Sequence, residues 1–273
     1  MEKSKIELVE NKTYPSKILG LDISTSCIGA SIIYDDGINP PVIEKITHVV
    51  PKISNKISNK SIEALIKRKE IFEDEFLSKL TDAGITECVI EAPLIFALGN
   101  SNPTTVAQLL KFNALLSEAI YYKLGIIPYY ISSLDARVYA FPELLGLRKF
   151  NRKGEEYDLK HIKSDIKNNH IVPFADFPYD CDKKNVMLNL VSEQYKDIHW
   201  VYNKKNDFKK ENFDACDSLV CCLGYSNLKR YGELNPKIES VMVEELNTHI
   251  NISYNFKIWD KIIQKEMKLS KNN

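Results

Sequence analysis

Four acidic residues stand where a carboxylate is costly or where their spacing groups them. Asp22 interrupts the apolar run ILGLDI, and Glu91 closes the apolar run CVIE. Asp214 and Asp217 lie three positions apart in FDACDSL, so on a helix they would share one face. A carboxylate in an apolar segment is destabilising unless it is paired, hydrogen-bonded or bound to a cation. Each residue alone is more often a cap or an ion-pair partner, but the four together suggest a cation site.

The chemistry of such a set is that of a divalent-metal site. Four carboxylates at close range cannot all stay ionised without cations, because like charges raise each other's pKa. Ligands that are all oxygen favour hard ions such as Mg²⁺ or Mn²⁺. Two such ions about 4 Å apart would activate water and stabilise the leaving oxygen in phosphodiester hydrolysis. The hypothesis requires a fold that brings the three segments together.

The elements that would position these residues alternate along the chain. Apolar, β-branched runs predict strands, and apolar residues at helical spacing behind a capping residue predict helices. The elements expected are two strands within 17–34, strands at 42–50, 87–93 and 126–132, and helices at 61–84, 102–125, 134–141, 182–195 and 213–232. This order predicts an α/β fold, a mixed five-stranded sheet with helices on both faces. If its first and fourth strands are neighbours, Asp22 and Glu91 lie side by side under the last helix.

The chain divides into one predicted domain and three segments outside its pattern. Residues 17–232 form the domain, residues 1–16 an N-terminal extension and residues 233–273 a C-terminal extension. Residues 146–181 are polar and rich in turn residues, so we expect an insertion or a mobile loop within the domain. The C-terminal extension contains one strand-like run, VMVEEL, and an amphipathic final segment.

Composition narrows the class of protein. The 273 residues include 37 Lys and Arg against 37 Asp and Glu, which argues against a generic polycation that coats nucleic acid. No apolar run approaches the roughly 18 residues of a membrane span, and the first residues do not resemble a secretory signal. None of the six cysteines forms a C-x-x-C pair. We therefore expect buried reduced thiols in an intracellular, cytoplasmic protein rather than a zinc site or a disulfide scaffold.

The three acidic motifs resemble those of the RuvC-type Holliday-junction resolvases, within the ribonuclease H-like superfamily. The family pattern is an aspartate on the first strand, a glutamate ending the fourth strand and D-x-x-D on the last helix. Here these are Asp22, Glu91, and Asp214 with Asp217. The order of elements is also the family's, and the match covers roughly residues 17–145 and 182–230. Family members are usually shorter and often more basic than this chain. The run I-S-T-S after Asp22 looks closer to divergent or phage-encoded members, whose location would be the host cytoplasm.

The resemblance implies a ribonuclease H-like fold and an endonuclease that resolves four-way DNA junctions with two Mg²⁺ or Mn²⁺ ions per site and no covalent intermediate. In it Asp22 would bridge both ions, Glu91 and Asp217 would each hold one, and Asp214 would hold or orient a ligand. Symmetrical resolution needs two active sites, so a homodimer is implied, formed through the 103–124 helix.

The resemblance also implies DNA contacts outside the carboxylate cluster. Phe96 would lie against junction bases, although a Phe that covers the core fits equally well. Lys183 and Lys184 resemble phosphate contacts, although solvated lysines are the commoner case. The basic start of the 146–181 segment would follow a DNA arm through its four cationic residues, Arg148, Lys149, Arg152 and Lys153.

Two alternative functions fit parts of the sequence. The run GLDISTSCIG also resembles the first phosphate-binding loop of actin-like kinases and ATPases, in which Asp22 and Thr25 would serve an ATP–metal complex. That alternative needs a second loop of the form D-x-G-T or D-x-G-G, which the sequence lacks. The other alternative is a catalytically inactive ribonuclease H-like module that only binds DNA or a partner. The presence of all four carboxylates argues against it.

Overall fold

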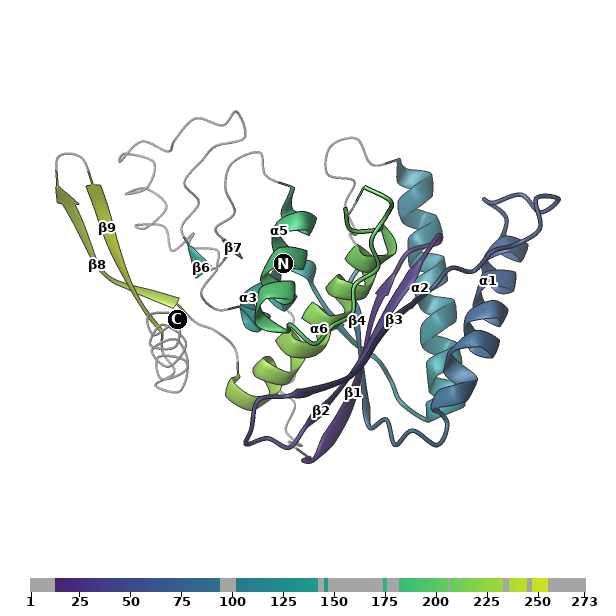
Figure 1. Ribbon diagram of the computed structural model, residues 1–273, viewed down its shortest axis with the longest axis horizontal. Coiled ribbons are helices and arrows are strands. Elements are labelled where there is room, and N and C mark those ends of the chain that lie inside the picture. The colour runs from purple at the N-terminus through teal and green to yellow at the C-terminus, as the bar shows by residue number, and fades with distance from the viewer. Residues whose placement is uncertain are drawn as a thin grey trace, which may run out of the picture.

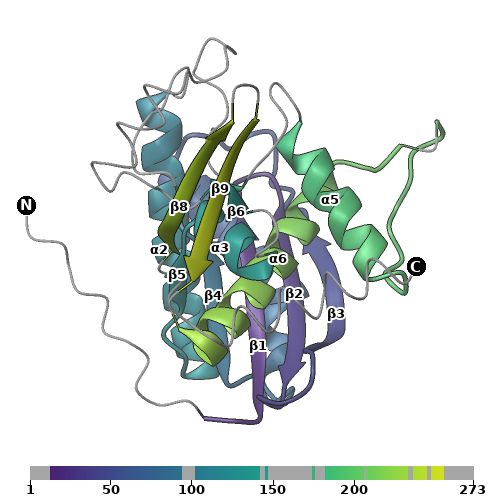
Figure 2. The ribbon, with the colours of Figure 1, turned by 90° about the vertical axis from the view of Figure 1, so that its left-hand side faces the viewer.

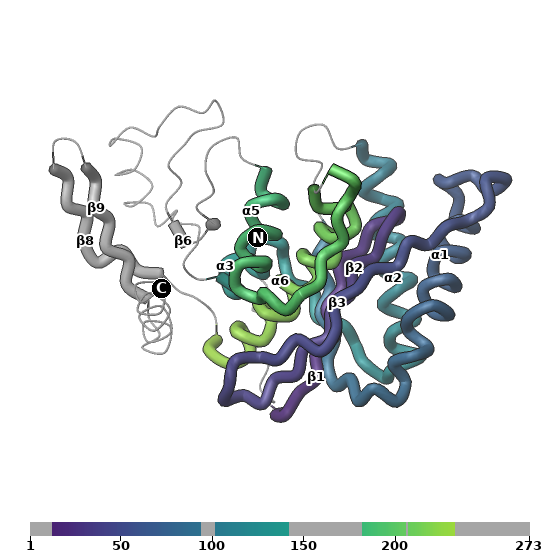
Figure 3. Tube along the Cα trace, in the orientation of Figure 1, coloured from purple at the N-terminus to yellow at the C-terminus, as the bar shows by residue number. Residues whose placement is uncertain are grey.

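The computed structural model describes the side chains of four stretches of the chain (Figure 3), residues 13–93, 102–141, 182–205 and 207–232. Beyond them it gives the backbone of two antiparallel strand pairs, β6 (Leu145–Gly146) with β7 (Phe174–Ala175) and β8 (Pro236–Glu244) with β9 (Asn247–Tyr254). β8 contains the first four residues, 241–244, of the strand-like run VMVEEL predicted in the C-terminal extension. β9 is a strand that the sequence pattern does not predict.

The central sheet has five strands in the order β3-β2-β1-β4-β5. They are β1 (Ser16–Ile23), β2 (Ile28–Asp35), β3 (Val42–Val49), β4 (Glu87–Glu91) and β5 (Tyr129–Ile131). β1, β2 and β3 form an antiparallel meander, and β4 and β5 continue the sheet parallel to β1. This confirms the predicted α/β fold class with a mixed five-stranded sheet, and it makes the first and fourth strands neighbours.

Helices follow the strands at the predicted places. They are α1 (Ile62–Glu75), the 3₁₀ turn η1 (Leu77–Leu80), α2 (Pro103–Leu124), α3 (Ser133–Ala140), α5 (Lys183–Gln194) and α6 (Glu211–Tyr231). Ser61 and Asn102 cap α1 and α2 as expected. The first helix ends nine residues before Gly84, because Phe76 leaves the helical region and the chain tightens into η1. Among the described helices, none is long and apolar enough to cross a bilayer.

The two faces of the sheet carry different helices. Figure 1 shows α1 and α2 on one side of the sheet and α3, α5 and α6 on the other. Side chains alternate along a strand, so β1 directs Leu19 and Leu21 towards α1 and α2, and Ile18 towards α6. In the same way β4 directs Ile90 to the first core and Val89 to the second. The helices on both faces are therefore held by separate apolar cores.

The cysteines belong to these cores. The five that the structure describes are all buried and free: Cys27, Cys88, Cys216, Cys221 and Cys222. The prediction of buried reduced thiols is confirmed for them. Cys181 lies outside the described residues.

Helix α6 lies unusually close to the sheet because two glycines face it. A Cβ on Gly29 of β2 would lie 1.9 Å from the backbone oxygen of Asp214, and one on Gly20 of β1 would lie 2.4 Å from Sγ of Cys222. Any larger residue at either position would push the helix away. The sequence therefore allows the start of α6 to rest directly on the strand that pairs with Asp22.

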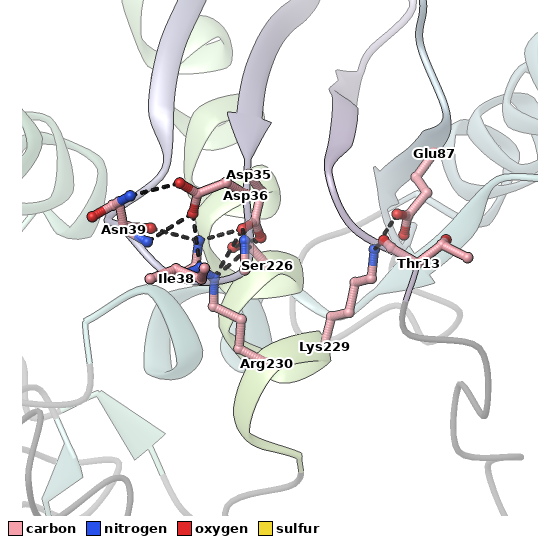
Figure 4. A network of polar contacts seen from close by, with 10 residues as sticks. Thr13, Asp35, Asp36, Ile38, Asn39, Glu87, Ser226, Lys229 and Arg230 are labelled. Atoms are coloured by element: carbon pink, nitrogen blue, oxygen red, sulfur yellow. Dashed lines mark hydrogen bonds and ion pairs between the residues drawn. The ribbon is translucent and has the colours of Figure 1, made fainter.

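The other end of α6 is fixed by two buried ion pairs (Figure 4). Arg230 pairs with Asp35, a fully buried residue at the end of β2, and Ser226 donates a hydrogen bond of 2.6 Å to the same carboxylate. Lys229 pairs with Glu87 at the start of β4. We call these contacts the clamp of α6. Together with the glycines they fix where the helix lies along the sheet.

The clamp predicts that Asp35→Asn is strongly destabilising. The variant leaves the guanidinium of Arg230 buried without its counter-charge, which should lower the free energy of unfolding by about 3 kcal/mol. Denaturant unfolding near neutral pH measures this. Asp36→Asn is the matched control, because Asp36 accepts hydrogen bonds within the turn, from the N–H groups of Ile38 and Asn39 and from the Asn39 side-chain amide. Equal unfolding midpoints for the two variants would contradict the clamp.

Candidate metal centre

Asp22 and Glu91 lie at the same edge of the sheet because β1 and β4 are parallel neighbours. Leu21 pairs with Ile90, so Asp22 and Glu91 are the next residues on the two strands. Each also lies at an even spacing from a residue that faces α6, Ile18 in β1 and Val89 in β4. Both carboxylates therefore belong to the face that α6 covers.

Helix α6 adds a third carboxylate to this pair. Oxygen atoms of Asp22, Glu91 and Asp217 all lie within 4.8 Å of one another. Asp217 is only 4% exposed. The structure thus brings together three of the four carboxylates that the sequence singled out, from three elements that are far apart along the chain.

Asp214 lies one helical turn before Asp217, at the margin of this group. It is buried, and its backbone rests on Gly29. Burial, followed by the nearby side chain of Asp214, raises the pKa of the Cys27 thiol, which lies in the turn between β1 and β2. Ser24 closes that turn by accepting the Cys27 N–H at 3.0 Å and donating to the Cys27 carbonyl at 2.8 Å. The turn therefore has its own hydrogen bonds and places the Cys27 thiol beside Asp214, a position that the apolar sequence context of Cys27 does not suggest.

Two cations of the chain approach the carboxylates. Nζ of Lys184 is 3.1 Å from Oδ2 of Asp217 and 3.6 Å from Oδ1 of Asp214. Asp182 caps α5 by accepting the Lys184 N–H at 3.0 Å, which fixes the backbone position of this lysine in the first turn of the helix. Nη2 of Arg137 in α3 is 3.7 Å from Oδ1 of Asp217. The sequence predicted Lys184 near the site but did not predict Arg137. The one sign of Arg137 in the sequence is a charged residue between the apolar positions of a short helix.

The electrostatics of the group follow from burial and like charge. Burial, followed by repulsion from Glu91, Asp217 and Asp214, raises the pKa of Asp22 well above its usual value. Burial and then the charge of Asp217 raise the pKa of Glu91 to about 7. For Lys184, burial lowers the pKa, but the surrounding carboxylates outweigh it and the net shift is upward. The expected rise in at least one carboxylate pKa is confirmed in direction.

The donor set fits a hard divalent cation. The three converging ligands are carboxylate oxygens, and no described sulfur or nitrogen ligand belongs to the group. Among the described residues, two cations lie beside the four carboxylates, and Mg²⁺ or Mn²⁺ would offset the repulsion that raises the pKa values of Asp22 and Glu91. The number of ions stays a prediction.

The structure describes only two of the residues predicted to contact DNA, Lys183 and Lys184. Lys183 is exposed at the first position of α5, next to Lys184. The others lie outside the described residues: Phe96, Arg148, Lys149, Arg152 and Lys153.

Among comparisons with known proteins, only the comparison of structures finds matches to this chain. No protein-family profile and no curated protein sequence matches this chain. The chain is similar to RuvC of Thermus thermophilus, with a TM-score of 0.45 and 12% identity over 78% of this chain and 95% of that one. It is also similar to the yeast mitochondrial Holliday junction resolvase Ydc2, with a TM-score of 0.42 and 12% identity over 79% and 80% of the two chains. At these TM-scores neither similarity by itself assigns an activity.

The raised pKa of Glu91 predicts a pH-dependent stability in chelator. A group whose pKa is raised on folding stabilises the native state below its unfolded pKa, and this contribution is lost as pH rises through the native value of about 7. Glu91→Gln should therefore match the wild type near about pH 5 and exceed it by about 2 kcal/mol near about pH 8. Thermal melts across this range measure the difference.

The control is Glu75→Gln, which neutralises an exposed carboxylate at the end of α1 and should leave the pH profile unchanged. Adding magnesium should stabilise the wild type more than Glu91→Gln, because the variant has lost a ligand. Identical pH profiles and magnesium responses in wild type and Glu91→Gln would mean that the carboxylates do not interact.

Proposed function

We propose that this protein is a divalent-metal-dependent endonuclease that nicks branched DNA, with four-way junctions as its main substrate. The observation that supports this most directly is the convergence of Asp22, Glu91 and Asp217 within 4.8 Å. The order of strands and helices and the family resemblance of the three acidic motifs point the same way. The proposed reaction is hydrolysis of a phosphodiester by water, with no covalent enzyme intermediate.

The carboxylates would divide the work of holding Mg²⁺ or Mn²⁺. Asp22, Glu91 and Asp217 would hold the ions, and Asp214 would hold or orient a ligand. Bound ions of this kind supply a water of lowered pKa and neutralise charge on the phosphate. The Cys27 thiol would help to orient the Asp214 carboxylate, since the two side chains are close enough for Asp214 to raise the pKa of the thiol.

The two protein cations would have different roles. The side chain of Lys184 is 49% exposed, so its ammonium group can reach a substrate phosphate while it stays near Asp217. The side chain of Arg137 is 16% exposed and would orient Asp217 from the protein side. Further from the centre, Phe96 would stack on junction bases and Lys183 would contact phosphate. The basic residues Arg148, Lys149, Arg152 and Lys153 would follow a DNA arm.

We also propose that the active form is a homodimer, because a junction is cut symmetrically only by two centres. The predicted interface is α2, whose exposed residues include Leu110, Tyr121 and Tyr122. An intracellular location stays a prediction that rests on the reduced cysteines.

One comparison of substrates separates this function from the alternatives. The protein is incubated with magnesium and a labelled four-way junction, a linear duplex or an RNA–DNA hybrid. Selective cutting of the junction supports the proposal. Binding without cutting would indicate the inactive ribonuclease H-like module, and ATP turnover without DNA would indicate the actin-like alternative.

Asp22→Asn should abolish cleavage but keep junction binding, because it removes a metal ligand and little surface. We expect a loss of at least about 10³-fold in cleavage rate, with the junction dissociation constant changed by less than about threefold. Single-turnover cleavage and fluorescence anisotropy measure the two quantities. Asp82→Asn, an exposed carboxylate beyond η1, is the control. Cleavage by Asp22→Asn at near the wild-type rate would overturn the site.

The homodimer predicts paired nicks at symmetric positions from one bound assembly. Light scattering should give twice the 31.3 kDa mass of the chain for the free protein, and two chains plus the mass of the DNA for the complex. Replacing Leu110 by Glu in the exposed face of α2 should produce monomers that nick a junction without resolving it. A wild type that is strictly monomeric in both states would instead favour a simple nicking nuclease.

A further inference from the structure

The connection between α5 and α6 contains a hairpin, residues 201–210, with a concentrated positive charge. It carries four lysines, Lys204, Lys205, Lys209 and Lys210, and a single acidic residue, Asp207. The whole chain has a formal net charge of zero, so this is a marked local excess. All four lysines are exposed. We call this segment the lysine hairpin; its residue 206 lies outside the described part of the chain.

The hairpin is ordered by its own hydrogen bonds. Tyr202 and Phe208 form an antiparallel bridge, and the backbone N–H of Lys209 donates to the Val201 carbonyl at 3.0 Å. The side-chain oxygen of Asn203 accepts the N–H groups of Lys205 and Asp207 at 2.8 and 3.0 Å. These bonds hold the lysines on a defined backbone rather than on a free loop.

The hairpin is also attached firmly to α6. Asn212, only 3% exposed in the first turn of α6, accepts the Val201 N–H at 3.2 Å and donates to the Val201 carbonyl at 2.6 Å. The rings of Tyr202 and Phe208 stack at 5.0 Å, and Trp200 meets Phe208 edge-on at 6.3 Å. Trp200 and Phe208 pack against the core beneath α6. The position of the lysines is therefore tied to the position of the helix.

The same helix carries two carboxylates of the candidate metal centre. Lys210 is the N-cap residue of α6, and Asp214 follows four residues later, about 6 Å along the helix axis. Figure 2 shows the α5–α6 connection projecting beyond α5, away from the body of the sheet. Lys210 thus lies about one helical turn from Asp214, and the rest of the connection extends outward from α6.

Within the described part of the chain, the positive charge of the hairpin is not neutralised by ion pairs. The ion pairs between described residues include none of the four lysines. Asp207 is engaged by the Asn203 side-chain amide at 3.2 Å, so it belongs to the hairpin's own bonding. Four exposed lysines on an ordered backbone form a surface that attracts a polyanion.

We propose that the lysine hairpin binds the phosphate backbone of a double-stranded DNA arm next to the metal centre. This rests on the proposed function, because a centre that cuts a phosphodiester requires the flanking backbone to pass close to it. Lysines meet phosphates as point charges and read no base sequence. The hairpin would therefore fix the position of the arm, and would contribute salt-dependent affinity without sequence preference.

The test compares two double variants, Lys204→Gln with Lys205→Gln and Lys209→Gln with Lys210→Gln, with a matched control. The control is Lys67→Gln with Lys79→Gln, two exposed lysines in α1 and η1. Binding of a labelled four-way junction is followed by fluorescence anisotropy in chelator over a range of salt concentrations. Each hairpin variant should bind about tenfold more weakly at about 0.1 M salt, with a salt dependence shallower by about two counterions. The control should bind like the wild type.

Melting temperatures of all variants should equal that of the wild type, since exposed lysines are changed and the Asn212 anchor is kept. If the wild type cuts junctions and both hairpin variants bind them with unchanged affinity and salt dependence, the hairpin proposal is wrong while the proposed function stands. If the wild type neither binds nor cuts branched DNA, both fail. An equal loss of affinity in the control would also overturn the proposal, because the effect would then follow net charge alone.

Discussion

The cost of holding four carboxylates at one end of a buried helix governs the organisation of this molecule. Asp22 and Glu91 are fixed by the pairing of two parallel strands, so they cannot move apart without breaking the sheet. Asp217 is pressed against them by α6, and their pKa values rise accordingly. Repulsion of this kind has to be offset by the protein or by cations. The layer formed by α3, α5 and α6 supplies part of the offset, since Arg137 comes from α3 and Lys184 from α5.

The two ends of α6 have opposite electrostatic roles. Its first turns carry the repelling carboxylates, whereas its last turn carries Lys229 and Arg230 in buried ion pairs with the sheet. Buried ion pairs of this kind add little net stability to the fold but are costly to break. Their main effect here is therefore to fix the position of α6 on the sheet. Gly29 completes the arrangement by letting Asp214 rest on β2. A helix held at both ends in this way keeps its carboxylates close together whether or not a cation is bound.

Much of the fold, and the three carboxylates that the structure brings together, could be predicted from the sequence, and the features that could not have identifiable physical reasons. Strand runs, caps and acidic motifs depend on local spacing, which is why the five strands could be predicted, and with them that Asp22 and Glu91 lie side by side if β1 and β4 are neighbours. Arg137 and Cys27 could not, because their roles come from the packing of a short helix and a turn against α6. The early end of α1 reflects the buried position of Phe76 rather than any breaker residue. β9 begins with Asn247 and contains Asn251, both poor strand formers that hide its pairing with β8.

The unequal exposure of the two protein cations bears on how such a centre could admit its substrate. Lys184 is half-exposed on a flexible stem, and Arg137 is held with most of its side chain buried. Under the proposed function, an incoming phosphate would draw the ammonium group of Lys184 outward, because it is the cation that can turn without losing buried contacts. Asp217 would keep Arg137 as its partner and gain freedom on its other oxygen. Of the two cations, Lys184 would thus move away from Asp217 towards the substrate phosphate, and Arg137 would stay paired with Asp217. The lysine hairpin, fixed to the same helix, would set the direction from which the phosphate backbone arrives.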